Sequence, residues 1–289
     1  MRPAGGGTDP GARNSLPPAP EPLPVPVVDN HAHLDMVRHG DPLYAVADAV
    51  EAAKAVGVQR IIHVACDVES IEGVAAVIDP HPEVSAAVAL HPNDAARLAE
   101  RGRLAAAYGV VEAALAHPKV VAVGETGLDF YRTGAAGRPA QEESFRWHID
   151  LAKRHDVALQ IHDRDAHADV LRVLESEGAP ARVVLHCFSG DREFARECLD
   201  RGFHLSFAGV ITFKGSTALR EALAVTPLER VLVETDAPFL APVPWRGRAN
   251  ASYLVPTTVR AMAEVLGVAV PVLCAAVTAN CERLYGAWG

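Results

Sequence analysis

The feature that most constrains this chain is a regular alternation between short apolar runs, often β-branched, and longer stretches rich in Ala, Leu, Glu and Arg. We expect strands at residues 26–29, 60–64, 84–90, 120–124, 158–161, 183–185, 204–206 and 231–233. We expect helices at residues 43–56, 97–117, 140–155, 166–177, 192–201, 217–224, 255–265 and 271–285. Continuously apolar strands that alternate with helices predict a parallel sheet covered by helices.

The number of these units favours a closed barrel. Residues 27–289 hold eight of them, about 33 residues each, close to the ~30 residues of one strand–helix–strand step. We therefore predict an α/β fold, a (β/α)8 TIM barrel, formed by residues 27–289 as one domain. A doubly wound open sheet is the alternative, but its usual glycine-rich first turn does not follow residue 29.

The first 26 residues differ in composition from the rest of the chain. They hold eight of the 21 prolines and four of the 22 glycines, with few large apolar side chains. Such a segment cannot bury enough surface to offset the entropy lost on ordering. We therefore expect residues 1–26 to be a disordered tail.

Charge and cysteine usage limit the functional classes. The net charge of −9 counts against a protein that coats nucleic acid without specificity, although a deep site neutralised by metal ions escapes that objection. The five cysteines form no CxxC pair, which favours reduced thiols and a cytoplasmic location. We see no secretory signal, and the apolar run at 265–279 is short for a membrane span, so we expect no membrane association.

The strongest local motif is Asp29-Asn30-His31-Ala32-His33, at the end of the first expected strand. Residues two apart in an extended chain point to the same side, so His31 and His33 can face one metal ion. Two incidental surface histidines would give the same pattern. The motif alone therefore leaves both interpretations open.

Further polar groups follow other expected strands at their carboxyl ends, where barrel enzymes place catalytic residues. They are Glu125, His162, His186 and Asp236. Each alone has a structural explanation, as a helix cap, a core histidine or a turn residue before Pro238. Together with the first motif, they place four histidines, one glutamate and one aspartate at five strand ends, which indicates a metal site.

This mixture of ligands indicates hydrolytic chemistry. Imidazole and carboxylate groups suit zinc, manganese and other divalent ions. We expect two divalent ions, magnesium, manganese or zinc, bridged by Glu125, because two-ion sites stabilise the attacking and leaving oxygens of a displacement at phosphorus. Glu125 and Asp236 are thus the predicted catalytic residues. Asp236 could be a ligand, a general base that orients the water, or both.

Basic side chains follow the same strand ends. They are Arg132, Arg164, Lys214, Arg246 and Arg248. Guanidinium groups match phosphate oxygens with two parallel hydrogen bonds, whereas an exposed loop cation is the simpler explanation of each. We predict substrate contacts from Arg164, Arg132 and Arg246. Phe130 and Tyr131 could stack on a base or pack on the rim of the barrel.

The chain resembles the TatD family of metal-dependent deoxyribonucleases, among the amidohydrolase-like barrels. The resemblance covers almost everything after residue 26 and rests on residues 29–34, 124–130, 161–166, 186–190 and 234–238, on Gln141, Phe145, Arg246-Gly247, Asn250 and Asn280. It implies a TIM barrel of the metallo-dependent hydrolase type that trims DNA from an end, with magnesium, manganese or zinc.

The resemblance also implies residue roles. His31, His33, Glu125 and Asp236 would hold one ion, and Glu125 would bridge to a second ion on His162 and His186. Asn250 joins the predicted substrate contacts, single-stranded DNA or DNA ends are the expected substrate, and a monomer is expected. The chain departs from the usual family pattern at Asn30, His148 and Ser252, none of them a predicted ligand.

Two other functions compete with a metal-dependent DNase. A two-metal barrel hydrolase of a small ester, lactone or amide would use the same water-activating ions. The acidic net charge favours that alternative, whereas the motifs and a basic rim near Arg164 favour the nuclease. A non-catalytic binding protein is the third hypothesis, and the complete ligand set argues against it.

Overall fold

The computed structural model of the chain describes residues 16–38, 40–42 and 44–286. Eight parallel strands are found there, and each pairs with the next one in chain order. They are β1 (Val27–Ala32), β2 (Val58–Ala65), β3 (Val84–Val88), β4 (Val120–Asp129), β5 (Ala158–Arg164), β6 (Val183–Leu185), β7 (His204–Phe207) and β8 (Val231–Val233). A bridge between Ala32 and Ala237 joins the two ends of the sheet. The predicted (β/α)8 TIM barrel is confirmed, because a doubly wound sheet would pair its strands out of order.

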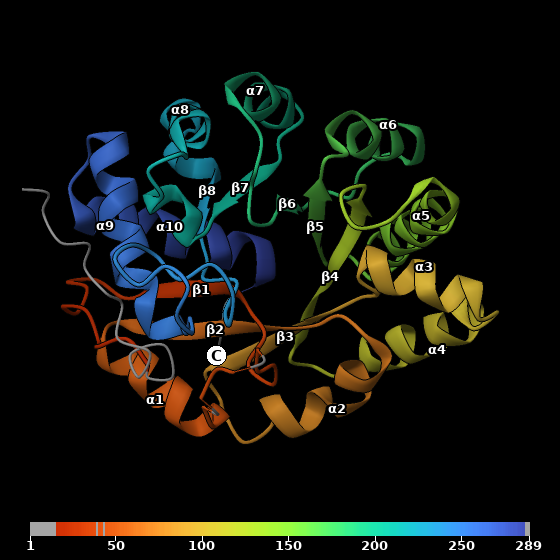
Figure 1. Cartoon of the computed structure of the whole chain (residues 1–289), viewed down its shortest axis with the longest axis horizontal. Helices are drawn as coiled ribbons and strands as arrows, with labels where there is room; N and C mark the ends of the chain where they lie inside the picture. The colour runs from red at the N-terminus through yellow and green to blue at the C-terminus, as the bar shows by residue number, and fades with distance from the viewer. Residues whose placement is uncertain (1–15, 39, 43, 287–289) are drawn as a thin grey trace, which may run out of the picture.

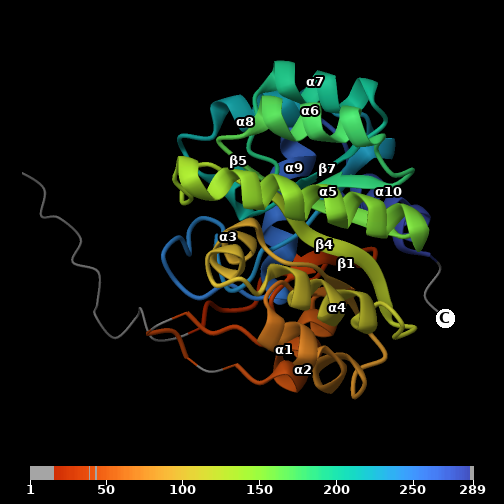
Figure 2. The ribbon, with the colours of Figure 1, turned by 90° about the vertical axis from the view of Figure 1, so that its right-hand side faces the viewer.

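The helices surround the strands, as Figures 1 and 2 show. Those described are α1 (Val46–Ala55), α2 (Val68–Ile78), α3 (Pro92–Glu100), α4 (Leu104–Ala114), α5 (Arg138–Arg154), α6 (His167–Glu177), α7 (Arg192–Asp200), α8 (Thr217–Val225), α9 (Val255–Leu266) and α10 (Val270–Tyr285). Short 3-10 turns lie at η2 (Ala135–Gly137), η3 (Gly209–Thr212), η4 (Leu228–Arg230) and η5 (Ser252–Leu254).

Two helices differ from the expectation. The single helix expected over residues 97–117 is instead α3 and α4, because Gly102 between them adopts a φ of +66° that ends a helix. Helix α2 was not predicted, although its start has a clear signal. Asp67 accepts a hydrogen bond from the backbone of Ser70, and the Ser70 side chain accepts one from Asp67, which is a complete capping box.

Two hydrophobic cores hold the barrel together. One lies between the strands and the surrounding helices, and the other fills the barrel interior. The interior core combines small and branched side chains such as Val28, Ile62, Ala122 and Val184 with Tyr285 of α10. The interior is a packed core and not a channel. The polar residues that follow the strands therefore lie at the carboxyl-terminal end of the barrel, which we call its mouth.

Residues 16–26 differ from the disordered tail that composition predicts, while residues 1–15 lie outside the described residues. Tyr253 donates a hydrogen bond to the carbonyl of Pro17, and Arg260 donates one to that of Pro22. The Leu23 backbone donates to Val56, and the Leu23 side chain is only 8% exposed. An extended proline-rich segment makes no hydrogen bonds within itself. Its carbonyl groups are therefore free to accept hydrogen bonds from side chains of the barrel.

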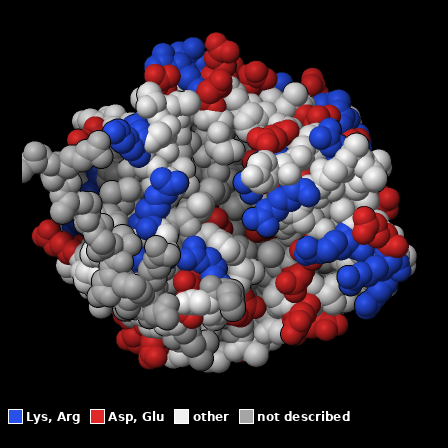
Figure 3. Space-filling view, viewed as in Figure 1, with Lys and Arg blue, Asp and Glu red and all other residues white. Residues whose placement is uncertain are grey.

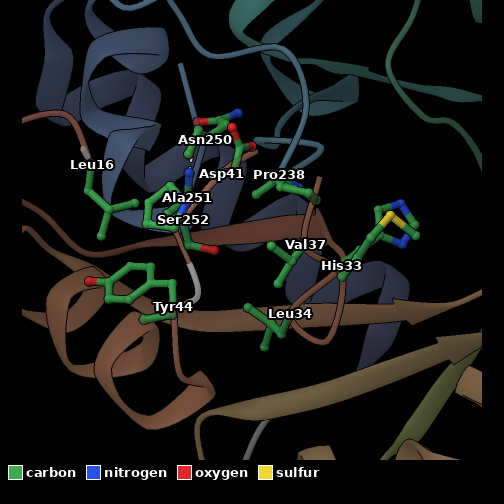
Figure 4. Close-up of a pocket in the computed structure, with 15 residues that line it drawn as sticks. Leu16, His33, Leu34, Val37, Asp41, Tyr44, Pro238, Asn250, Ala251 and Ser252 are labelled. Carbon is green, nitrogen blue, oxygen red and sulfur yellow. Dashed lines mark hydrogen bonds between the residues drawn. The ribbon is translucent and has the colours of Figure 1, made fainter. Parts of the chain in front are cut away.

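A small cavity of about 40 Å³ separates this segment from the loops after β1 and β8. Figure 4 shows Leu16 and Tyr44 at one end of it, and His33 at the other. The N-terminal segment therefore packs close to the loops that carry the candidate site.

Among the described residues, no single helix has the length and apolar character needed to cross a bilayer. The segments Ser252–Leu266 and Val270–Tyr285 reach that threshold only as a pair, bent by 108° at the break between them. All five cysteines lie in the described part of the chain and are unpaired.

We predict that Leu23→Ala lowers the free energy of unfolding by about 2 kcal/mol, because it removes a buried side chain from the hydrophobic core between the strands and the helices. Urea unfolding of the full chain measures this. Glu21→Ala is the matched control, since Glu21 is exposed on the same segment. Equal stability of both variants would mean that residues 16–26 contribute nothing to the barrel.

Candidate metal centre

The six predicted ligands meet at the mouth of the barrel. His31 and Glu125 belong to β1 and β4, and His162 belongs to β5. His33, His186 and Asp236 stand in the loops just after β1, β6 and β8. All but His31 line a cavity of about 600 Å³, and His31 lies fully buried beneath it.

Four of these side chains form a first ligand set. The Nε2 atom of His33 lies 3.5 Å from Oε1 of Glu125 and 3.6 Å from Oδ1 of Asp236. The Nε2 atom of His31 lies 3.9 Å and 3.8 Å from the same two oxygens. Ligand atoms about 2.1 Å from one ion are separated by roughly these distances. Nε2 of His31 is also buried without a hydrogen-bond partner, as a metal-binding nitrogen would be.

The other oxygen of Glu125 faces a second ligand set. Oε2 lies 2.7 Å from Nε2 of His186 and 3.1 Å from Nδ1 of His162. These two ring nitrogens are 3.5 Å apart. Glu125 therefore presents one oxygen to each set, which is the geometry of a bridging carboxylate.

Three of the four histidines have a hydrogen-bond partner for the ring nitrogen that faces away from the ligand set. The partners are the Gln160 side chain for His31, the Val64 carbonyl for His33 and Glu234 for His186. The outer nitrogen of His162, Nε2, makes no hydrogen bond, but it lies 3.4 Å from the Asp129 carboxylate. Such partners hold a proton on the outer nitrogen and leave the inner lone pair for a metal ion. The residues present thus fit a metal centre.

The partner of His31 belongs to a polar network inside the barrel. Gln160 accepts from Nδ1 of His31 at 3.1 Å and donates to the Asn30 carbonyl and to the Tyr285 hydroxyl. The Tyr285 hydroxyl donates to the Asn30 side chain, which itself donates to Ser206. Because Gln160 is engaged on both sides, the orientation of the His31 ring is fixed by the barrel interior.

The electrostatics of the site favour cations. Burial acts to raise the pKa of Glu125, but His186 and His162 together hold it well below its usual range. Burial would lower the pKa of His33 and His186, yet Asp236 beside His33 and Glu125 beside His186 raise both well above the usual range. Despite burial, the pKa of His162 is raised as well, by Asp129 and Glu125, so the site without metal favours protonated imidazoles where an ion would bind.

Several residues at the site were not predicted. His91, directly after the expected strand 84–90, groups with Glu125 and His162, and burial lowers its pKa to about 3. Cys66, just after β2, groups with His33 and Glu125. The rule that selected the other ligands, a polar group directly after a buried strand, would also have found these two.

The predicted substrate contacts have separate locations. Arg164 and Arg132 line the large cavity. Arg246 is exposed outside it, with its guanidinium 4.6 Å from the centre of the Phe213 ring. Asn250 does not line the large cavity; its amide donates to the carbonyls of Thr235 and Phe239, and so it holds the loop after β8 together.

Comparison with known proteins identifies the family. The sequence profile described as TatD related DNase matches residues 28–286. The chain belongs to the TatD family. It is a metal-dependent hydrolase, as the sequence predicted.

Three similar proteins support this assignment. The metal-dependent hydrolase TatD of Mycobacterium tuberculosis is 46% identical over 266 residues, which cover 90% of this chain and 98% of the relative. A Citrobacter rodentium protein named 3'-5' ssDNA/RNA exonuclease TatD is 33% identical, with coverage of 83% and 91%. The crystal structure of the TatD homologue YjjV from Escherichia coli K12 has a TM-score of 0.81 and 26% identity, with coverage of 90% and 98%.

We predict that Glu125→Gln removes the charge shared by both ligand sets and lowers hydrolysis by at least about a thousandfold. Metal content after dialysis should fall in parallel, which elemental analysis measures. Glu143→Gln is the control, because Glu143 is an exposed carboxylate on α5. Turnover near that of the unmodified protein would exclude Glu125 as a bridge.

Metal binding should depend on pH. His33 and His186 have raised pKa values, so they carry protons near neutral pH that a metal ion must displace. We expect protons to be released when metal binds at neutral pH, and affinity to rise with pH and fall as the solution is acidified. Titration calorimetry of zinc in two buffers with different ionisation enthalpies measures this release. Heats that do not depend on the buffer would contradict the assignment.

Proposed function

We propose that this protein is a nuclease that uses two divalent ions, magnesium, manganese or zinc, to trim nucleotides from the end of single-stranded DNA. The observation that carries the proposal is the position of Glu125, whose two oxygens face two separate ligand sets 2.7–3.9 Å away. Two-ion sites of this kind suit displacement at a phosphodiester.

Each ligand has a role in the proposed reaction. His31, His33, Asp236 and one Glu125 oxygen would hold the first ion, and His162, His186 and the other oxygen the second. When bound, the ions supply an activated water and neutralise charge on the phosphate. The Asp236 side chain is 15% exposed and lines the cavity, so it can also accept a proton from the water.

The cavity matches a nucleotide in size, and arginines on its wall can bind a phosphate. Its volume of about 600 Å³ lies within the range of ligand pockets. Arg97, Arg132 and Arg164 line its wall, and Figure 3 shows Lys and Arg side chains on both sides of the central hollow. Arg164 lies 3.9 Å over the centre of the Tyr131 ring, and Tyr131 is 65% exposed. This pair can bind a phosphate and stack on a base.

The similarity to the Citrobacter rodentium exonuclease also supports a single-stranded nucleic acid as substrate. Hydrolysis of a small ester, lactone or amide is the alternative, and it requires neither these arginines nor the exposed Tyr131. We further propose that the protein acts as a cytoplasmic monomer without membrane association.

The first experiment is hydrolysis of end-labelled single-stranded DNA by metal-stripped protein, with magnesium, manganese or zinc restored one at a time. We expect progressive shortening from one end that depends on metal and is absent in Glu125→Gln. Intact DNA, together with hydrolysis of a small ester or lactone by the metal-loaded protein, would favour the alternative function.

Arg164→Ala should weaken the binding of DNA more than that of an uncharged ester. We expect KM for single-stranded DNA to rise about tenfold, because one phosphate contact and one stacking platform are lost. Arg164→Lys should recover only part of this, since an ammonium group cannot match a phosphate with two parallel hydrogen bonds. Equal KM values for the three proteins would place Arg164 outside the substrate site.

A further inference from the structure

A second group of cationic and aromatic side chains lies outside the metal cavity, on the loops after β7 and β8. It consists of Phe213, Lys214, Trp245 and Arg246, which we name the outer platform. Phe213 and Trp245 are partly exposed, and Lys214 and Arg246 are exposed. The Arg246 guanidinium lies 4.6 Å from the centre of the Phe213 ring. Among the described residues, no acidic group forms an ion pair with Lys214 or Arg246.

The loop that carries Phe213 is held in place by hydrogen bonds. Arg220 of α8 donates to the carbonyls of Phe213, at 2.8 Å, and Ile211, at 3.2 Å. The Ser216 hydroxyl donates to the carbonyl of Val210 at 2.7 Å. Because the backbone is fixed by its own helix, Phe213 is presented without the ordering cost of a free loop.

The two loops of the outer platform are also joined to each other. The backbone of Val243 donates to the Thr212 hydroxyl at 2.8 Å. Gly209 packs so closely on the second loop that a Cβ there would lie 2.2 Å from the Leu240 carbonyl oxygen. Phe213 and Arg246 are therefore parts of one surface, although 33 positions separate them in the chain.

The outer platform is continuous with the metal cavity. Val210, three positions before Phe213, lines the cavity wall, as does Leu240 in the loop that leads to Trp245. The opposite wall is formed by Arg164 and Arg132. A strand whose last phosphodiester lies at Glu125 can thus leave the cavity across Val210 and Leu240 and reach the outer platform.

We propose that the outer platform binds the nucleotides next to the one being removed, so that the protein prefers strands of several nucleotides to a dinucleotide. Lys214 and Arg246 match backbone phosphates. Phe213 and Trp245 each have an arginine over one face, and the part of each ring that stays exposed can contact bases, a combination that binds single strands without sequence preference. This inference rests on the proposed nuclease function and adds a length requirement to it.

The test compares two substrates and two double variants. Lys214→Ala/Arg246→Ala removes one lysine and one arginine from the outer platform. Lys153→Ala/Arg201→Ala removes the same two types of charge where α5 and α7 end, on the opposite side of the barrel. We measure kcat and KM with a twelve-residue thymidine oligonucleotide and with a thymidine dinucleotide, and the melting temperature of each protein.

For the outer-platform variant, we expect the ratio of kcat/KM between the long and the short substrate to fall about tenfold, mainly through KM of the long one. The salt dependence of long-strand binding should weaken by about 1.4 in slope, for two lost phosphate contacts. The control variant should keep both the ratio and the slope of the unmodified protein.

The outcomes separate the two proposals. If the unmodified protein cleaves both substrates and the outer-platform variant keeps its ratio and slope, the outer platform does not bind the strand, while the nuclease function stands. A fall of the same size in the control variant would also overturn the inference. If metal-loaded unmodified protein cleaves neither substrate, the nuclease function and the inference both fail.

Discussion

The structure at the mouth of this barrel depends on one buried carboxylate. Glu125 is 5% exposed and lies between nitrogens of four histidines, with one oxygen facing each ligand set. A buried charge is tolerated only when it is paired and hydrogen-bonded, so those imidazoles must reach it from three other strands. Closure of the sheet makes this possible, because it brings β1 beside the loop after β8 through Ala32 and Ala237.

The barrel interior contributes more than hydrophobic packing. Gln160, Asn30 and Tyr285 are buried polar side chains whose hydrogen bonds connect the His31 ring to the core. A buried polar network lowers the stability of the fold if any of its groups lacks a hydrogen-bond partner. When all its groups are paired, it fixes the orientation of the side chains in it. The final helix thereby influences the metal site, because its Tyr285 holds the glutamine that orients His31.

The sequence predicted the barrel and the meeting of the six ligands because both follow from local rules. Apolar runs set the strands, and polar residues directly after them come to one rim. Patterns of neighbouring residues do not predict hydrogen bonds between residues that are distant in the chain. Nothing near Asn250 shows that two carbonyls use its amide, and the composition of residues 16–26 does not reveal that Tyr253 and Arg260 bind their carbonyls. His91 was missed although the same local rule applies to it.

Bound metal ions would reconcile this acidic protein with the anionic substrate that we propose. The chain carries a net charge of −9, and six carboxylate side chains line the cavity together with Arg97, Arg132 and Arg164, of which Arg97 is paired with Asp94. Two divalent ions would add four positive charges there, so that the mouth attracts a phosphate while the rest of the surface repels it. A cavity of about 600 Å³ lies within the size range of small-ligand pockets, so it can take the end of a strand, as the proposed exonuclease reaction requires.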